Sequence, residues 1–252
     1  MEFKTISCTK ESSFLSPEEN IAVIKLNKPG VSNVLSKDML LEIDSALEET
    51  RRDEQTRVVV LSAEGEKAFC TGIDPDEPNP QDVERLADQV FKKIEEFGKP
   101  IIAAVAGEVS GLGVGVALAC DMRLAAENAR IQNPTDVARR LAEIVGRPNA
   151  ADVLFSGRAI DAKEAENMGL VNKVVPTDEL STTVNWTAGK IASSAPLAVQ
   201  LSKRCVNKSF EVSIVEGNKL ELDAILQCAR TEDLREGIKA VFEKRTPQFK
   251  GK

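Results

Sequence analysis

A continuous apolar run meets a cluster of glycines between positions 100 and 121 of the chain. The run extends from Ile101 to Ala106, and glycines stand at positions 107, 111, 113 and 115. This pattern predicts a buried strand, a tight turn and the start of a buried helix. The first amides of a helix lack intrahelical partners and lie at the positive end of its dipole, so such a turn can stabilise an anion or a developing oxyanion. Glycines that only permit close helix packing explain the spacing equally well.

The chain has 252 residues, which is enough for one large core. Apolar runs alternate with helical patterns in its first part and predict an α/β core over residues 1–176. Beyond Thr177 long helical patterns dominate, and we expect helices over 180–193, 196–208 and 216–229, followed by an amphipathic tail. Residues 177–252 are therefore predicted to form a helical C-terminal region.

Several shorter segments of the first part have distinct patterns. Residues 21–26 and 58–61 predict strands, and Ser36 is positioned to cap the helix that follows it. Further strands are predicted over 122–126 and 171–175, and further helices over 81–97, 136–145 and 162–168. Residues 63–80 include Thr71-Gly72-Ile73-Asp74 and are long for a loop in a compact domain, so they form either a functional loop or a surface lid.

The charge balance limits the partners of the chain. Lysine and arginine number 33 against 40 aspartate and glutamate residues, a net charge of −7. This disfavours a general nucleic-acid or membrane partner, and an anionic ligand would need a local basic patch. The chain has neither an apolar run of ~18 residues nor the apolar core of a signal peptide at its N-terminus. Its five cysteines are scattered without C-x-x-C spacing, so we expect no metal site, no disulfide framework and a cytoplasmic location.

Histidine and tyrosine are both absent from the sequence. Their absence excludes Ser-His-Asp and Cys-His catalysis and every imidazole metal ligand. Acid–base chemistry would have to use aspartate, glutamate, lysine or cysteine, or a substrate and water positioned by backbone dipoles.

Five stretches, taken in order, carry a resemblance to a known family. They are I-A-V-I-K-L-N-K-P (21–29), K-A-F-C-T-G-I-D (67–74), K-P-I-I-A-A-V-A-G-E-V-S-G-L-G (99–113), F-S-G-R-A-I-D-A-K-E-A-E-N-M-G-L-V-N-K-V-V-P (155–176) and T-E-D-L-R-E-G-I-K-A-V-F-E-K-R (231–245). Across nearly the whole chain they resemble the crotonase, or enoyl-CoA hydratase/isomerase, superfamily. The match is specific for the superfamily and not for one reaction.

The resemblance implies a fold, a ligand and an assembly. The fold is an α/β, crotonase-like spiral of repeated β-β-α units with a helical C-terminal trimerisation region. The ligand is an acyl-CoA of fatty acid metabolism, in which coenzyme A is part of the substrate and no separate cofactor is required. The assembly is a homotrimer or a dimer of trimers.

The resemblance also implies that two backbone amides hold the thioester carbonyl, and they match Ile73 and Leu112. A backbone donor does not depend on its side chain, so this oxyanion hole could survive the leucine that replaces a usual glycine at position 112. The substrate-binding positions carried over are Lys28, Lys67, Ala68, Phe69, Gly72, Gly111, Thr135 and Lys244, the last from a neighbouring subunit. A solvated surface role explains each lysine equally well.

The sequence departs from the family at the residues that activate water. Hydratases of this family use two glutamates, and Gly115 and Thr135 stand in their places. The segment that follows the second position is also shorter than usual. Loss of one positioned acid–base group costs about 10²- to 10⁴-fold in rate, so we expect little hydratase activity. The candidate replacements are Asp136, which we favour, and Glu108, Asp74, Glu77 and Glu143.

Two functions of different classes remain open. The first is an enzyme that stabilises a thioester enolate of an acyl-CoA and catalyses isomerisation, decarboxylation or hydrolysis. Decarboxylation fits the missing bases, because loss of CO₂ generates the enolate without proton abstraction. The second is a non-catalytic paralogue that binds CoA esters or acts as a trimeric scaffold.

Overall fold

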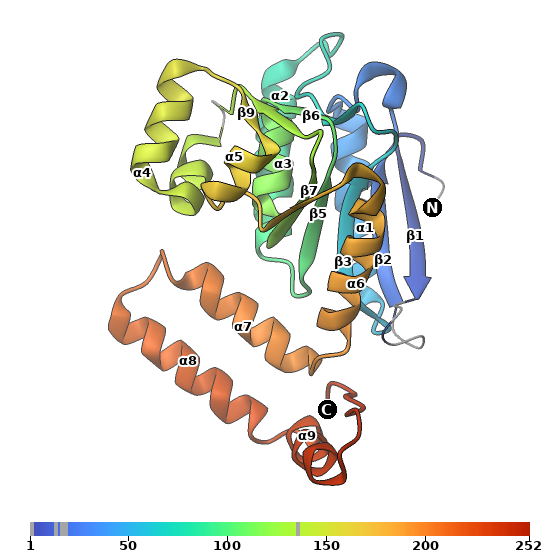
Figure 1. Cartoon of the computed structure of the whole chain (residues 1–252), viewed down its shortest axis with the longest axis vertical. Coiled ribbons are helices and arrows are strands. Elements are labelled where there is room, and N and C mark those ends of the chain that lie inside the picture. Colours follow the sequence, from blue (N-terminus) through green and yellow to red (C-terminus); the bar gives the residue numbers. More distant parts are fainter. Residues whose placement is uncertain (1–2, 13–14, 16–19, 135–136) are drawn as a thin grey trace.

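The computed structural model describes residues 3–12, 15, 20–134 and 137–252. Its larger sheet has six strands in the order β1-β2-β3-β5-β7-β10 (Figure 1). The strands are β1 (Ile6–Ser12), β2 (Asn20–Leu26), β3 (Thr56–Ala63), β5 (Ile101–Val105), β7 (Met122–Ala126) and β10 (Lys173–Val175). The β1–β2 pair is antiparallel and the other neighbours are parallel. The apolar run before the glycine cluster is therefore β5, inside this sheet.

A second, smaller sheet runs beside the first and has the order β4-β6-β8-β9. Its strands are β4 (Ala68–Cys70), β6 (Glu108–Ser110), β8 (Arg130–Gln132) and β9 (Ile160–Asp161). Three successive units of the chain have the same order of elements: β3-β4-α2, β5-β6-α3 and β7-β8-α4. In each unit the first strand belongs to the larger sheet, the second strand belongs to the smaller sheet, and a helix follows. The predicted spiral of β-β-α units is therefore confirmed.

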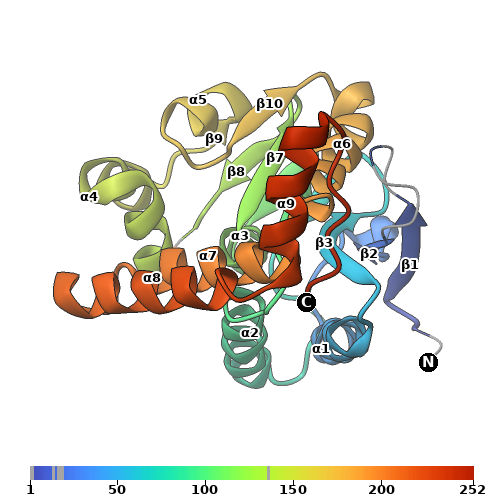
Figure 2. The ribbon, with the colours of Figure 1, turned by 90° about the horizontal axis from the view of Figure 1, so that it is seen from below.

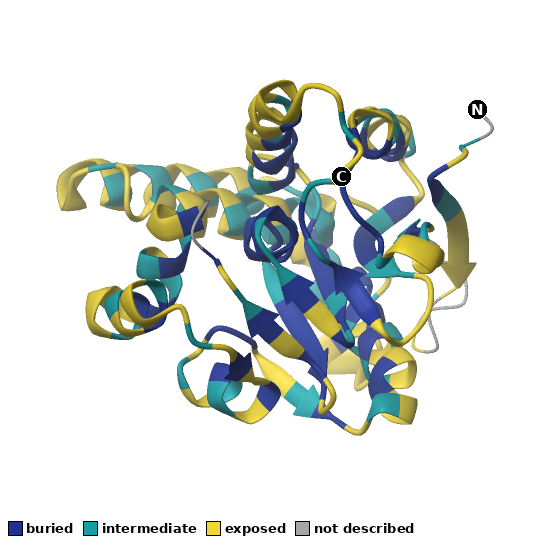
Figure 3. Ribbon diagram, turned by 90° about the horizontal axis from the view of Figure 1, so that it is seen from above, coloured by how far each residue is buried: buried dark blue, intermediate teal, exposed yellow. Residues whose placement is uncertain are grey.

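Alternate residues of the larger sheet face two separate apolar cores. Val59 and Leu61 of β3 pack with α1 (Lys37–Arg52), α2 (Pro80–Glu95) and α3 (Leu112–Ala119), whereas Val58 and Val60 pack with α6 (Leu180–Ala192). Because both faces of the strand are covered, its apolar run is continuous rather than alternating. Figure 3 shows the buried residues concentrated in the central strands, with the long helices at the edge mostly exposed or intermediate.

The helices match the sequence predictions closely, with one addition. Ser36 caps α1 by accepting a hydrogen bond from the Met39 amide, as predicted. The helix predicted over 136–145 corresponds to the first part of α4 (Ala138–Ser156). At Gly146 the backbone leaves the helical conformation, with φ of +75°, and a second helical segment continues to Ser156, which the sequence did not predict. The remaining elements before α6 are α5 (Ala162–Asn167) and the short 3-10 helices η1 (Pro29–Val31) and η3 (Thr177–Glu179).

Three C-terminal helices extend away from the sheets (Figures 1 and 2). They are α7 (Pro196–Lys208) and α8 (Ile214–Cys228), close to the predicted ranges, and α9 (Glu232–Glu243), which lies in the predicted amphipathic tail. In contrast, α6 packs on the larger sheet. The division at residue 176 stays a prediction.

A largely buried ion pair fixes α7 to the body of the molecule. The Lys203 side chain is 7% exposed, and its Nζ lies 2.8 Å from Asp121 Oδ2. Nζ also donates to the carbonyl oxygens of Ile94 and Lys99, while Asp121 Oδ2 accepts from the Ile101 amide. Burial raises the pKa of Asp121, and the neighbouring Lys203 ammonium opposes that shift. This contact joins α7 to the start of β5.

Lys203→Met should destabilise the fold, because it leaves the Asp121 carboxylate buried without its cation. We expect the free energy of unfolding to fall by about 3 kcal/mol, the typical cost of breaking a buried ion pair from one side. Lys208→Met in the same helix is the control, since Lys208 pairs with Glu211 at the surface, where an ion pair contributes less than about 1 kcal/mol. Urea denaturation at one fixed protein concentration measures both losses, and equal losses would contradict this account.

Candidate functional site

Two loops meet at the carboxyl ends of β4 and β6. Gly72 follows β4, and Gly111 joins β6 to α3. Both glycines have positive φ, +94° and +51°, which other residues rarely adopt. A Cβ atom at Gly72 would lie 3.8 Å from the backbone nitrogen of Leu112 and 3.5 Å from the carbonyl oxygen of Ser110. The structure therefore brings the loop that carries Ile73 against the first residue of α3.

The amides of Ile73 and Leu112 are both available to a ligand. The two neighbours of Ile73 form hydrogen bonds with the backbone of Leu35. The Leu35 amide donates to the Gly72 carbonyl at 2.6 Å, and the Asp74 amide donates to the Leu35 carbonyl at 2.9 Å. Leu112 is the first residue of α3, where amides have no intrahelical acceptor. Within the described residues, neither amide donates to a protein acceptor. An unsatisfied donor at a helix N-terminus, such as the Leu112 amide, favours a negatively charged oxygen.

The helix approaches β4 closely because position 113 is a glycine. A Cβ atom there would lie 2.1 Å from the carbonyl oxygen of Cys70, so any side chain would force α3 away from the strand. Cys70 is fully buried in this contact, and burial raises the pKa of its thiol to about 12. The thiol therefore stays protonated at neutral pH and cannot serve as a nucleophile or base.

Gly115, where hydratases carry a glutamate, faces apolar groups. A Cβ atom at this position would lie 2.5 Å from Cε2 of Phe91 and 2.9 Å from Cγ1 of Val137. Phe91 and Val137 are each 2% exposed. The space beside Gly115 is thus filled by an aromatic ring and a methyl group.

Two of the candidate carboxylates hold loops in place. The Asp74 Oδ2 lies 3.4 Å from the Nζ of Lys28, and its other oxygen accepts from a backbone amide of its own turn. The Glu77 Oε1 accepts from the Lys37 amide at 2.9 Å. Both therefore connect the loop after β4 to the segment around η1 and α1.

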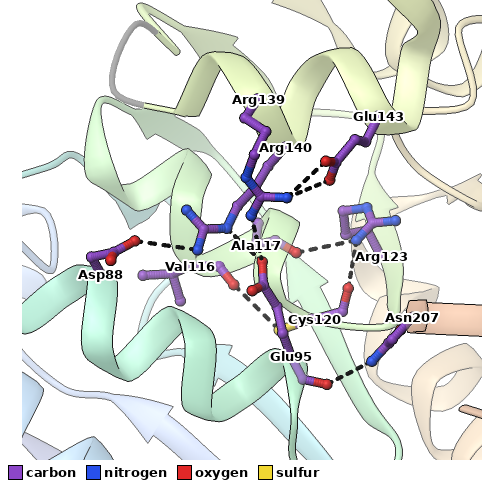
Figure 4. A network of polar contacts seen from close by, with 10 residues as sticks. All are labelled: Asp88, Glu95, Val116, Ala117, Cys120, Arg123, Arg139, Arg140, Glu143 and Asn207. Atoms are coloured by element: carbon purple, nitrogen blue, oxygen red, sulfur yellow. Dashed lines mark hydrogen bonds and ion pairs between the residues drawn. The ribbon is translucent and has the colours of Figure 1, made fainter. Parts of the chain in front are cut away.

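The other described candidates lie in different settings. Glu143 pairs with Arg139 one turn away on α4 at 2.7 Å (Figure 4). Glu108 is exposed at the first residue of β6, whereas the Leu112 amide lies beyond the end of that strand. Asp136, the favoured candidate, and Thr135 lie outside the described residues, so their roles stay predictions.

The predicted CoA-binding residues fall into distinct places. Lys28 lies beside the loop of Ile73 through its contact with Asp74. The side chains of Ala68 and Phe69 are buried, so these residues can offer a ligand only backbone atoms, and the Ala68 carbonyl already accepts from the Asn33 side chain at 2.9 Å. Lysine 244 ends α9, which lies at the opposite end of the molecule from β6 (Figure 1), so within one chain it is remote from the oxyanion amides.

Lys67 belongs to an open hollow at the amino ends of β4, β6 and β8. The hollow has a volume of about 490 Å³ and is lined by Glu66, Lys67, Gly107, Glu108, Asn128, Arg130 and Gln132. It lies at the edge of the smaller sheet opposite to Gly72 and Leu112, because those residues follow the carboxyl ends of the same strands. Lys67 is therefore separated from the oxyanion amides by the length of β4.

Sequence reasoning missed Phe91, although the helix that carries it was predicted. Its only signal is an aromatic residue on the apolar face of that helix, which by itself indicates core packing. The described residues contain no group of three or more metal-ligating side chains that could hold an ion. Over the same residues, no helix has the length and apolar character needed to cross a membrane.

Comparison with known proteins identifies the family. The family model described as "Enoyl-CoA hydratase/isomerase" matches residues 16–252. "Short-chain-enoyl-CoA hydratase" of Clostridium acetobutylicum is 36% identical over 246 residues, which cover 92% of this chain and 94% of that protein. "Crotonyl-CoA hydratase" of Syntrophomonas wolfei is 36% identical over 254 residues, covering 95% and 98% of the two chains.

A solved structure extends the similarity to the fold. The crystal structure of an enoyl-CoA hydratase from Bacillus anthracis superposes with a TM-score of 0.92 at 32% identity and covers 99% of this chain and 100% of that one. With its repeated β-β-α units and near-complete coverage by these relatives, the chain belongs to the enoyl-CoA hydratase/isomerase family of the crotonase superfamily.

Proposed function

We propose that this chain acts on an acyl-CoA and stabilises a thioester enolate with the backbone amides of Ile73 and Leu112. The proposal rests on one observation. A Cβ atom placed on Gly72 would lie only 3.8 Å from the backbone nitrogen of Leu112, so the loop that carries Ile73 lies against the start of α3. Two converging amides at the start of a helix are suited to an oxygen that gains negative charge during the reaction. Membership of the family supports the acyl-CoA ligand.

We further propose that the reaction is not ordinary hydration. Gly115 supplies no carboxylate, and the atoms nearest to its Cβ position belong to the apolar side chains of Phe91 and Val137. Asp74, Glu77 and the other described candidates are engaged or lie elsewhere. A reaction that needs no protein base fits this site best. In decarboxylation of a 2-carboxyacyl-CoA, the bond from the α-carbon to the carboxylate breaks, its electron pair forms the enolate, and water then protonates the α-carbon.

The same apolar surroundings also favour a second candidate, a non-catalytic CoA-ester-binding or scaffold protein. Such a protein would keep the two amides as a ligand contact and have no acid–base residue at all. Fold retention accounts for the loops without any chemistry. Turnover separates the two candidates, because both predict binding.

We also propose that the chain assembles as a homotrimer or a dimer of trimers. The C-terminal helices and their connections carry many exposed apolar side chains: Val206, Phe210, Ile214, Val215, Leu222, Ile225, Leu226, Leu234, Ile238, Val241 and Phe242. Apolar surface of this extent is typical of a protein–protein interface. In such an assembly Lys244 would reach a neighbouring subunit's CoA, as the resemblance implies. A cytoplasmic location remains a prediction from the scattered cysteines, and the absence of nucleic-acid and membrane partners remains a prediction from the charge balance.

A panel of saturated, 2,3-unsaturated and 2-carboxylated acyl-CoAs in D₂O tests the proposed reaction. We expect a 2-carboxylated member to lose CO₂ and gain deuterium at the α-carbon, because the enolate forms without a base. Hydration of crotonyl-CoA should be at least about 10²-fold slower than in hydratases that keep both glutamates. Mass spectrometry of each thioester and of free CoA gives the readout. Rapid hydration would refute the proposal, whereas binding without any turnover would favour the scaffold.

Gly72→Ala tests the paired amides. The new Cβ would lie 3.8 Å from the Leu112 nitrogen, within the space that the thioester oxygen needs, so we expect turnover to fall by about 10²- to 10³-fold. Gly65→Ala is the matched control, because Gly65 also has a positive φ, +84°, but its Cβ would meet only Pro29. Kinetics and thermal denaturation of both variants separate the site effect from backbone strain. Equal loss of turnover in the two variants would count against the oxyanion hole.

If the wild-type chain shows no turnover, the same comparison is made with binding. The measured quantity is then the affinity of each variant for acyl-CoA relative to its affinity for CoA.

A further inference from the structure

One face of α2 contacts both Gly115 of α3 and the helix α4. Asp88, Phe91 and Glu95 are spaced at i, i+3 and i+7, so they lie along one face of the helix. The ring of Phe91 points at Gly115 of α3, and the two carboxylates beside it bind α4. The position of the ring is therefore set by contacts on both sides.

Arg140 of α4 holds this arrangement together, and Figure 4 shows its contacts with the carboxylates of Asp88 and Glu95. Its guanidinium carbon lies 5.4 Å from the centre of the Phe91 ring, and its Nε lies 2.5 Å from Glu95 Oε1. Its Nη2 is 3.4 Å from Asp88 Oδ1, and the side chain is only 11% exposed. A cation over an aromatic face with two carboxylate partners restricts the ring to one orientation.

The ring occupies space near the start of α3. Gly115 lies one turn after Leu112 on the same face of α3, and helical side chains lean toward the preceding turn. A side chain at position 115 would thus project toward the Leu112 amide, and the Phe91 ring edge fills that volume at 2.5 Å from the Cβ position. An acyl group whose carbonyl is held at Leu112 meets this ring edge.

We propose that Phe91, clamped by Arg140, limits the size of the acyl group that the site accepts. The proposal rests on the proposed function, since it requires an acyl-CoA held at the Ile73 and Leu112 amides. It assigns specificity for the acyl group to a residue of α2 that makes no hydrogen bond to the ligand. The acyl groups that fit are short, because the ring edge limits their length.

Phe91→Leu tests the proposal, because leucine has no atoms at the Cε and Cζ positions that face Gly115. We expect the affinity for hexanoyl-CoA relative to acetyl-CoA to rise by about fourfold or more, the gain from burying one further methylene. Phe97→Leu is the matched control: Phe97 is also buried and lies under an arginine, Arg51, but no contact joins it to Gly115 among the described residues. Isothermal titration calorimetry with both acyl-CoAs, and with CoA alone, gives the ratios.

Gly115→Ala, made with and without Phe91→Leu, tests the packing without any ligand. Alone it should lower the melting temperature by about 2–4 °C or more through contact with the ring. In the Phe91→Leu background the loss caused by Gly115→Ala should be smaller, because only the contact with Val137 Cγ1, at 2.9 Å, then remains and alanine is the better helix former. Equal effects in both backgrounds would overturn the proposal.

The binding outcomes separate this proposal from the one it rests on. An unchanged hexanoyl-to-acetyl ratio in Phe91→Leu, with both ligands bound by the wild-type chain, overturns the role of Phe91 alone. A wild-type chain that binds no acyl-CoA overturns the proposed function and the role of Phe91 together. A rise in the ratio for Phe97→Leu equal to that for Phe91→Leu also overturns the specific role.

Discussion

The close approach of α3 to β4 is the contact on which the site depends. It exists because Gly113 has no Cβ, which would otherwise lie 2.1 Å from the Cys70 carbonyl oxygen. The approach brings the Leu112 amide beside Gly72, and the Leu35 backbone fixes the loop of Ile73 from its other side. Backbone geometry alone therefore brings the loop of Ile73 against the first residue of α3, and the proposed donors are backbone amides that no side chain has to supply.

Among the described residues, several charged groups near this site are held in contacts that join elements of the fold. Lys28 and Asp74 pair across the loop, while Arg140 and Glu95 join α4 to α2. The side chain that packs against Gly115 of α3 is the apolar ring of Phe91. Under the proposed function, such a site stabilises negative charge on an oxygen, and no described carboxylate is placed to transfer the proton.

Much of the fold could be predicted from the sequence because its signals are local. The strand predicted over 122–126 and the helix predicted over 196–208 agree with β7 and α7, since apolar spacing and proline mark their limits. The edge strand β1 was not predicted, because its residues, I-S-C-T-K-E-S, are mostly polar and only partly buried. The strands of the smaller sheet are two or three residues long, too short for periodicity to detect. The contact of Phe91 with Gly115 joins separate elements, which no local pattern reveals.

Infrared difference spectroscopy of a bound acyl-CoA tests the central claim most directly. With ¹³C at the thioester carbonyl, the stretching band of the ligand can be separated from those of the protein. Two converging amides should polarise the C=O bond, so the account predicts a shift to lower frequency on binding, and the shift should be reduced in Gly72→Ala. An unshifted band, with binding established by titration, would contradict the claim that the Ile73 and Leu112 amides form an oxyanion hole.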